Sequence, residues 1–257
     1  MRIVGKGFTA TALGPIAHHH PGVAVLAAGV SRIRPEYAHH DLAREAALVA
    51  DQARRCASRG EKLVYFSTAS AALYGAPRCS GTEDCRHAPR TAYGRHKLAM
   101  EQLVKESGCS WLILRLTHLV GPRQQPYQLV PALVAQALDG RVRVLRRSSR
   151  DLLDVEDFVA MTDMLLGSGI ERETVNVASG RSTEVEAIID HVAALTATDP
   201  VRDYIEESSR HSVSIEKLRS LSPRSGMWTF SADYYRSVLD RAVTDLLRAP
   251  RSGSVRT

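Results

Sequence analysis

Short apolar runs alternate with helix-forming segments along the first half of the chain, and this alternation limits the fold more than any other feature. The apolar runs cover residues 1–5, 23–28, 62–66 and 111–116, and the helix-forming segments cover residues 11–17, 41–59 and a stretch from residue 93. Continuous apolar runs are typical of strands buried on both faces of a parallel sheet. Because parallel strands need crossover connections, the order predicts an α/β fold with right-handed crossovers.

The composition is ordinary for a globular protein. The chain has 257 residues, of which 44% are hydrophobic and 24% are charged, enough for one α/β domain with or without a small appendage. No apolar run approaches the roughly 20 residues of a membrane span, so we expect no membrane contact and a cytoplasmic location. The net charge is +6, and the basic residues are scattered along the chain with few aromatic residues among them. This pattern favours anionic small molecules over nucleic acid as partners.

The cysteines and the clustered histidines do not predict a metal site. Cys56, Cys79, Cys85 and Cys109 lack metal-ligand spacing, and we expect reduced thiols, although Cys79 and Cys85 fall in one loop and could pair under oxidation. Histidines occupy residues 18–20, where a solvated turn is expected because consecutive residues cannot all converge on one ion.

A glycine-rich turn joins the first apolar run to the first helical segment. It has the pattern G-x-G-x-x-A and consists of Gly5, Lys6, Gly7, Phe8, Thr9 and Ala10. At a strand-to-helix turn, such glycines let backbone N–H groups and a helix N-terminus approach a pyrophosphate. The turn therefore predicts dinucleotide binding, and a plain tight turn is the alternative.

Tyr93 and Lys97 stand four residues apart at the start of an apolar helix, so their side chains share one helix face. An ammonium group beside a phenol favours the phenolate and makes the tyrosine a usable acid or base near neutral pH. The same spacing is also common in helices that have no chemical role. Hydroxyl side chains at Ser67, Thr68 and Ser70 follow the strand at 62–66, at the edge where open α/β sheets bind ligands.

Seven segments in order resemble the extended short-chain dehydrogenase/reductase family, the NAD-dependent epimerase/dehydratase group. They are the glycine turn at Gly5 and Gly7, residues 26–28, residues 70–75, Tyr93 with Lys97, residues 114–116 with 120–122, residues 150–157 and residues 175–180. The resemblance implies a Rossmann-like, doubly wound parallel sheet with a small C-terminal substrate lobe. The expected divisions are a core at 1–122, a mixed core and substrate-binding lobe at 123–247, and a disordered tail at 248–257.

The resemblance also implies a catalytic triad. Ser70 would hydrogen-bond the reacting oxygen, with Ser67 and Thr68 as nearby alternatives, Tyr93 would be the acid/base, and Lys97 would hold the nicotinamide ribose. NAD or NADP would be bound by Gly5, Lys6, Gly7, Phe8, Thr9, Ala28, Gly29, Ser67, Thr68 and Lys97. A sugar or nucleotide-sugar-like substrate would be bound by Ser70, Arg123, Arg143 and Arg147. A helix at 129–138 and a basic strand at 141–147 are expected in the substrate lobe; the strand would suit a diphosphate, or it could be a solvated edge strand.

The chain departs from the family pattern after its first helix. It passes almost directly to the strand at 23–28, where the family carries a second strand, a helix and a third strand. This predicts a sheet shortened by a βαβ portion and a truncated adenosine pocket. We therefore consider an NAD(P)-dependent epimerase, dehydratase or ketoreductase, a redox-neutral isomerase, lyase or cyclase that has lost cofactor use, and a non-catalytic ligand sensor. The complete set of Ser70, Tyr93 and Lys97 favours an enzyme, and the resemblance leaves a homodimer open.

Overall fold

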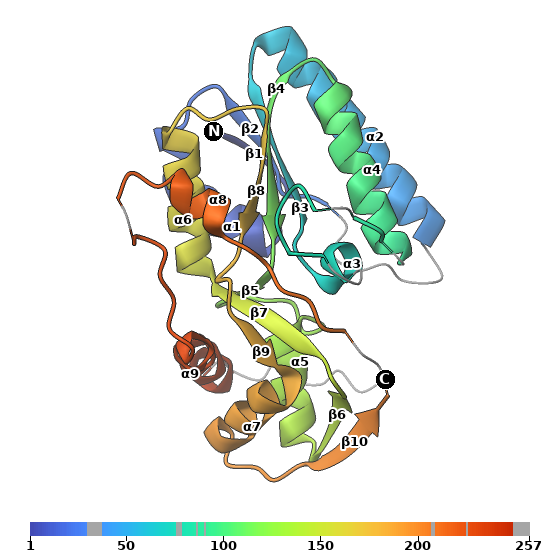
Figure 1. Ribbon diagram of the computed structural model, residues 1–257, viewed down its shortest axis with the longest axis vertical. Helices are drawn as coiled ribbons and strands as arrows, with labels where there is room; N and C mark the ends of the chain where they lie inside the picture. The colour runs from blue at the N-terminus through green and yellow to red at the C-terminus, as the bar shows by residue number, and fades with distance from the viewer. Residues whose placement is uncertain are drawn as a thin grey trace.

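A five-stranded parallel sheet forms the upper half of the molecule (Figure 1). The computed structural model describes residues 1–29, 38–75, 79–85, 87–89, 91–206, 209–224 and 226–248. The strand order is β1 (Arg2–Val4), β2 (Val23–Leu26), β3 (Lys62–Thr68), β4 (Ser110–Leu116) and β8 (Glu173–Val177), and all neighbours pair in parallel. The predicted α/β fold with a parallel sheet is confirmed.

Helices cover both faces of this sheet, as expected for a doubly wound fold. On one face lie α2 (Ala38–Arg59) and α4 (Ala92–Glu106), which pack against each other; on the other lie α1 (Phe8–Leu13), α6 (Val155–Gly167) and α8 (Glu216–Ser220) (Figure 1). The short helix α3 (Ala71–Tyr74) follows β3 and packs against α4. Helix α2 begins three residues before the predicted segment 41–59.

The connection from β1 to β2 is as short as the sequence predicts. Residues 1–29 contain only α1 and the 3-10 helix η1 (Gly14–His19) between these strands. Gly5 has a φ of +139°, and a Cβ atom at this position would lie 2.5 Å from the Ala27 carbonyl oxygen. The turn therefore requires glycine at residue 5. The shortening relative to other family members stays a prediction.

The lower half contains two small sheets and the helices that pack against them (Figure 1). Strands β5 (His118–Val120), β7 (Ser149–Asp154) and β9 (Ser182–Glu184) form one sheet, and β6 (Arg141–Leu145) pairs with β10 (Val201–Ile205). The helices are α5 (Leu129–Leu138), α7 (Val185–Leu195) and α9 (Tyr234–Arg248). Helix α5 has the predicted bounds. Arg248 belongs to α9 and not to the predicted tail, whose remaining residues lie outside the described part of the chain.

Two expectations about cysteine and histidine were wrong. Cys79 and Cys85 form a disulfide, whereas Cys56 and Cys109 are free and buried. His20 is buried rather than solvated, because its Nε2 atom lies 2.7 Å from Oδ1 of Asp163 on α6. The contact of His20 joins segments that are far apart in the chain, so the local sequence does not encode it.

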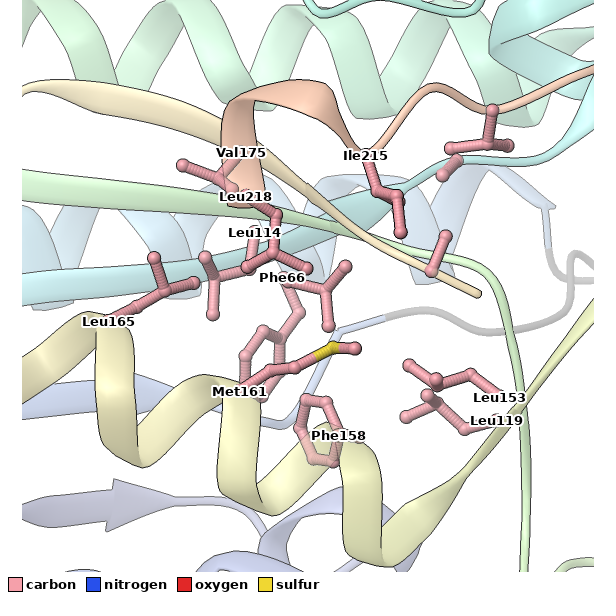
Figure 2. Close-up of a cluster of buried hydrophobic side chains, with 14 of the residues drawn as sticks. Phe66, Leu114, Leu119, Leu153, Phe158, Met161, Leu165, Val175, Ile215 and Leu218 are labelled. Atoms are coloured by element: carbon pink, nitrogen blue, oxygen red, sulfur yellow. The ribbon is translucent and has the colours of Figure 1, made fainter. Parts of the chain in front are cut away.

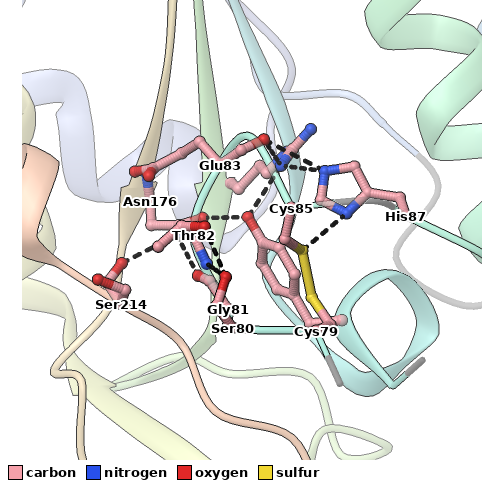
Figure 3. The surroundings of a disulfide bond; sticks show 11 residues. Cys79, Ser80, Gly81, Thr82, Glu83, Cys85, His87, Asn176 and Ser214 are labelled. Carbon is pink, nitrogen blue, oxygen red and sulfur yellow. Dashed lines mark hydrogen bonds between the residues drawn. A yellow bond between two sulfur atoms is a disulfide. The ribbon is translucent and has the colours of Figure 1, made fainter. Parts of the chain in front are cut away.

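The disulfide loop is tied to strand β8 (Figure 3). The backbone N–H of Asn176 donates to Oε1 of Glu83 at 2.7 Å. The side-chain amide of Asn176 donates to the carbonyl oxygens of Gly81 and Ser214, both at 2.9 Å. The loop between α3 and α4 is therefore anchored to the central sheet and to the segment that leads into α8.

An aromatic and aliphatic cluster joins α6 to the sheet (Figure 2). Phe158 is fully buried, and its ring meets that of Phe66 edge to face, with centroids 5.7 Å apart. Met161 and Leu165, on the same side of α6, are also fully buried in this cluster. Packing of large side chains at this density contributes much of the stability of a sheet–helix interface.

We predict that Phe158→Ala lowers the free energy of unfolding by about 3–5 kcal/mol, because it leaves a cavity between α6 and β3. Urea denaturation followed by circular dichroism measures this change. Leu247→Ala is the control, since Leu247 is 46% exposed on α9 and its truncation should change stability by less than about 0.5 kcal/mol. Equal losses in the two variants would contradict this description of the core.

Candidate functional site

A cavity of about 400 Å³ lies at the carboxyl edge of the parallel sheet. Residues after β2, at the end of β3 and after β4 contribute to its wall, together with the start of α1 and one face of α4. Among the predicted site residues, its lining includes Phe8, Thr9, Gly29, Ser67, Thr68, Ser70, Tyr93 and Lys97. The structure therefore brings the predicted triad and most of the predicted cofactor residues together.

Capping interactions fix the elements that carry Ser70 and Tyr93. Ser70 is the N-cap of α3; its hydroxyl accepts from the Ala72 N–H at 3.3 Å and from the Thr68 hydroxyl at 2.9 Å. Thr91 is the N-cap of α4 and accepts from the Gly94 N–H at 3.0 Å. Because α3 and α4 pack together, the serine and the tyrosine face one cavity from adjoining helix starts.

Lys97 lies beside Tyr93 but is engaged by the protein. Its Nζ atom is 5.8 Å from the centroid of the Tyr93 ring, and the residue is only 3% exposed. Nζ donates to Oε1 of Glu45 at 2.8 Å, to the Tyr65 hydroxyl at 3.3 Å and to the Phe66 carbonyl oxygen at 3.4 Å. The three ammonium hydrogens thus all have protein acceptors.

Glu45, on α2, is the centre of this buried polar cluster. Its Oε1 atom also accepts from the Tyr65 hydroxyl at 2.9 Å, and its Oε2 atom lies 3.2 Å from Nε2 of His96. Burial, together with the adjacent Glu45 carboxylate, raises the pKa of Tyr65 well above its ordinary value. A Cβ atom on Gly29 would lie 2.8 Å from Glu45 Oε1 and 3.0 Å from Lys97 Nζ, so the backbone at Gly29 lies directly against the pair.

A second cavity of about 390 Å³ lies on the other side of Ser70. Ser70 and His118 line both cavities, and Arg150, Arg210 and His211 belong to the second. Within the described chain, Nδ1 of His118 and both ring nitrogens of His211 are buried without a hydrogen-bond partner. Burial and the nearby Arg150 guanidinium lower the pKa of His211 to about 4 and that of His118 to about 3, so both imidazoles are neutral at pH 7.

Several predicted site residues lie elsewhere. Arg143 is exposed on β6, and Arg147 pairs with Glu206 at 3.3 Å; neither they nor Arg123 line either cavity. The first cavity is also not lined by four predicted cofactor residues, Gly5, Lys6 and Gly7 of the glycine turn and Ala28 after β2. The roles assigned to these residues stay predictions.

The sequence reasoning missed Glu45, His118 and His211. A signal for Glu45 was available, because this charged residue falls between Leu42 and Val49 on the apolar side of an amphipathic helix. The two histidines come from separate segments, and only the tertiary fold brings them to one cavity.

The sheet order and the cavity at its carboxyl edge define a Rossmann-like α/β protein. A model of the NAD dependent epimerase/dehydratase family matches residues 10–178, which is more than half of the chain. The chain therefore belongs to the NAD dependent epimerase/dehydratase family. That description agrees with the prediction of NAD or NADP as the cofactor.

Two curated relatives and one solved structure illustrate the similarity. The chain is 28% identical over 138 residues to the low-salt glycan biosynthesis protein Agl12 of Haloferax volcanii, covering 51% of this chain and 44% of that protein. It is 26% identical over 121 residues to dTDP-glucose 4,6-dehydratase of Neisseria gonorrhoeae, covering 44% and 35%. The structure of RMD from Pseudomonas aeruginosa, complexed with NADPH, superposes with a TM-score of 0.78 at 19% identity, covering 95% of this chain and 97% of that one.

The matches cover less than half the length of these curated relatives. The structural similarity, at 19% identity, shows the fold. Among the residues that the structure describes, no helix combines the length and apolar character needed to cross a membrane.

We predict that the neutral state of His211 makes stability depend on pH. The unfolded chain binds a proton at this side chain below about pH 6.5, whereas the folded protein does not until about pH 4. Stability contributed by the neutral imidazole is therefore present above pH 6.5 and falls as the pH drops toward 4. The stability difference between wild type and His211→Gln should shrink by roughly 1–3 kcal/mol over this range.

Urea unfolding at several pH values between 7 and 4.5 measures this difference. His40→Gln is the matched control, because the His40 side chain is 79% exposed. Parallel pH dependences of wild type and His211→Gln would show that His211 is not held neutral by the fold.

Proposed function

We propose that the protein is an NAD(P)-dependent epimerase, dehydratase or ketoreductase that acts on a sugar or nucleotide-sugar-like substrate. The observation that carries this proposal is the convergence of Ser70, Tyr93 and Lys97 on one cavity at the carboxyl edge of the sheet. Family membership supports the same class of chemistry. A binding module would have no need for a phenol and an ammonium group side by side.

The first cavity fits the nicotinamide end of a dinucleotide. It extends from the start of α1 to Tyr93, and its lining includes Ser67, whose Oγ atom is buried without a partner among the described residues. A bound ligand would satisfy this hydroxyl. Phe8, Thr9, Gly29, Ser67, Thr68 and Lys97 are the residues that would hold the cofactor. When bound, NAD or NADP supplies the hydride acceptor or donor.

In this proposal, Tyr93 accepts or donates the proton of the reacting substrate hydroxyl. Ser70 donates or accepts a hydrogen bond at the same oxygen and so orients it toward the phenol. Lys97, with its ammonium 5.8 Å from the ring centroid, favours the phenolate form that accepts the proton.

The second cavity suits the remainder of a nucleotide-sugar-like substrate. Arg150 and Arg210 provide positive charge for an anionic group such as a diphosphate, and guanidinium groups bind phosphate oxygens well. The neutral imidazoles of His118 and His211 can exchange hydrogen bonds with sugar hydroxyls. The names of the dTDP-glucose dehydratase relative and of a structural neighbour, a UDP-glucuronic acid 4-epimerase, support this substrate class.

Redox-neutral chemistry on the same fold is the second candidate. Two observations favour it: only α1 and η1 separate β1 from β2, and the ammonium hydrogens of Lys97 are already taken by Glu45, Tyr65 and Phe66. In this case Tyr93 and Ser70 would serve an isomerisation, elimination or cyclisation. Cofactor binding separates the two candidates.

We predict that the wild-type protein binds NADH or NADPH with submillimolar affinity, measured by fluorescence titration. Thr9→Trp should weaken binding at least tenfold because the indole would fill the cavity beside the start of α1. Thr11→Trp, an exposed position on the same helix, is the matched control and should bind as wild type does. Turnover without binding of either dinucleotide would favour redox-neutral chemistry.

We predict that Tyr93→Phe folds normally and lowers turnover by roughly 10²- to 10⁴-fold, the usual contribution of a positioned acid/base. The assay follows the conversion of nucleoside diphosphate sugars or their keto derivatives by chromatography, because an epimerase or dehydratase returns the hydride to its product and leaves no net change in NAD(P)H. Tyr127→Phe is the control, since Tyr127 lines the same cavity outside the proposed triad. Undiminished turnover in Tyr93→Phe would remove the tyrosine from the mechanism.

A further inference from the structure

We propose that Glu45 is a positioning residue that keeps Lys97 in its charged ammonium form beside Tyr93. The inference deepens the proposed function, because it assigns the state of the group that acts on the tyrosine. Glu45 does not line either cavity, so it would act through Lys97 and not on a substrate. Neither the family resemblance nor the Tyr93-to-Lys97 spacing calls for a carboxylate at this position.

The burial of Lys97 creates the need for a counter-charge. A lysine amine in a buried site tends to lose its proton, since burial disfavours the charged form. Lys97 is 3% exposed, and two of its acceptors, the Tyr65 hydroxyl and the Phe66 carbonyl, are neutral. The Glu45 carboxylate, 2.8 Å from Nζ, is the acceptor that carries a full negative charge.

The other ionisable groups near α4 already have partners. Around the pair lie His96 on α4 itself, Tyr65 on β3, Glu101 and Lys105 further along α4, Arg115 on β4 and Tyr74 on α3. Glu101 is held by two hydrogen bonds from Arg115, at 2.9 and 2.7 Å. Tyr74 accepts from the same guanidinium at 2.9 Å, and His96 faces the second oxygen of Glu45. The carboxylate that contacts the Lys97 ammonium is therefore that of Glu45.

The backbone at Gly29 lies against this pair. A methyl group at residue 29 would meet both Glu45 Oε1 and Lys97 Nζ within about 3 Å. The segment after β2 thus covers the ion pair on the side of the first cavity, which Gly29 also lines. The ammonium can act on the Tyr93 ring, 5.8 Å from its centroid, while it stays bound to the carboxylate.

The test is Glu45→Gln, which keeps the shape and one acceptor oxygen but removes the charge. Titration of protein labelled at tyrosine Cζ, followed by carbon-13 NMR with Tyr93→Phe for assignment, reads the phenol directly. Lys97→Met should move the Tyr93 titration to higher pH in a protein that keeps Glu45, because it removes a positive charge 5.8 Å from the ring centroid. In the Glu45→Gln background the same change should move it much less, since the amine has already lost its charge there.

Tyr65→Phe is the matched control, since it removes a neutral hydrogen bond to the same carboxylate and leaves both charges. It should leave the effect of Lys97→Met on the Tyr93 titration in place. An effect of Lys97→Met that is as large in folded Glu45→Gln as in the wild type would overturn the proposal.

If Glu45→Gln does not fold, its stability is compared with that of the double variant Glu45→Gln/Lys97→Met. An unpaired buried lysine is the expected cause, so removal of its amine should restore folding. A double variant that is no more stable than the single one would contradict the pairing role.

The NMR titration needs neither cofactor nor substrate, which separates this inference from the proposed function. An effect of Lys97→Met that depends on Glu45, in a protein that binds no dinucleotide, would support the role of Glu45 and contradict the proposed oxidoreductase. Dinucleotide binding and turnover, with an effect of Lys97→Met that does not depend on Glu45, would support the oxidoreductase and contradict the role of Glu45.

Discussion

Parallel pairing of the central strands is the constraint on which the site depends. Because β2, β3 and β4 run in the same direction, their carboxyl ends lie at one edge of the sheet. This brings Gly29, the segment 67–70 and Thr117 to a single cavity although they are far apart in the chain. The helix α4 then adds Tyr93 and Lys97 from the side. An antiparallel arrangement would send these segments to opposite edges.

The charged side chains under α2 and α4 are a second constraint. Burying a carboxylate or an ammonium group is unfavourable unless it is paired and hydrogen-bonded. Glu45 with Lys97 and Glu101 with Arg115 satisfy this requirement at the face of the sheet that the two helices cover. The opposite face is filled by apolar side chains of α6, with Phe158 at the centre (Figure 2). Packing of apolar side chains therefore determines how α6 docks on one face of the sheet, whereas docking of α2 and α4 on the other face also depends on paired charges.

The sequence predicted those parts of the fold that depend on local patterns. The apolar run at 62–66 lies in β3, and α5 spans the predicted residues 129–138, because burial of a strand and helical periodicity are both visible over a few residues. Tyr93 and Lys97 were found for the same reason, since helical spacing alone puts them on one face.

Contacts between distant segments could not be predicted in this way. The burial of His20 depends on Asp163, and the second cavity depends on the approach of residues 209–211 to Ser70. Arg143 and Arg147 were selected by residue type, but Arg143 on β6 and Arg147 after it line neither cavity, whereas Arg150 on β7 lines the second. Side-chain charge favoured an anionic ligand as a hypothesis, but it carried no information on which arginines face a cavity.

The central claim is that the cavity beside Tyr93 is a dinucleotide site, and a crystal structure of the protein grown with saturating NADH tests it most directly. The account predicts the nicotinamide in the cavity that Ser67, Tyr93 and Lys97 line, with the Glu45–Lys97 ion pair intact. A dinucleotide bound outside this cavity, or a cavity without it at saturating NADH, would contradict the account.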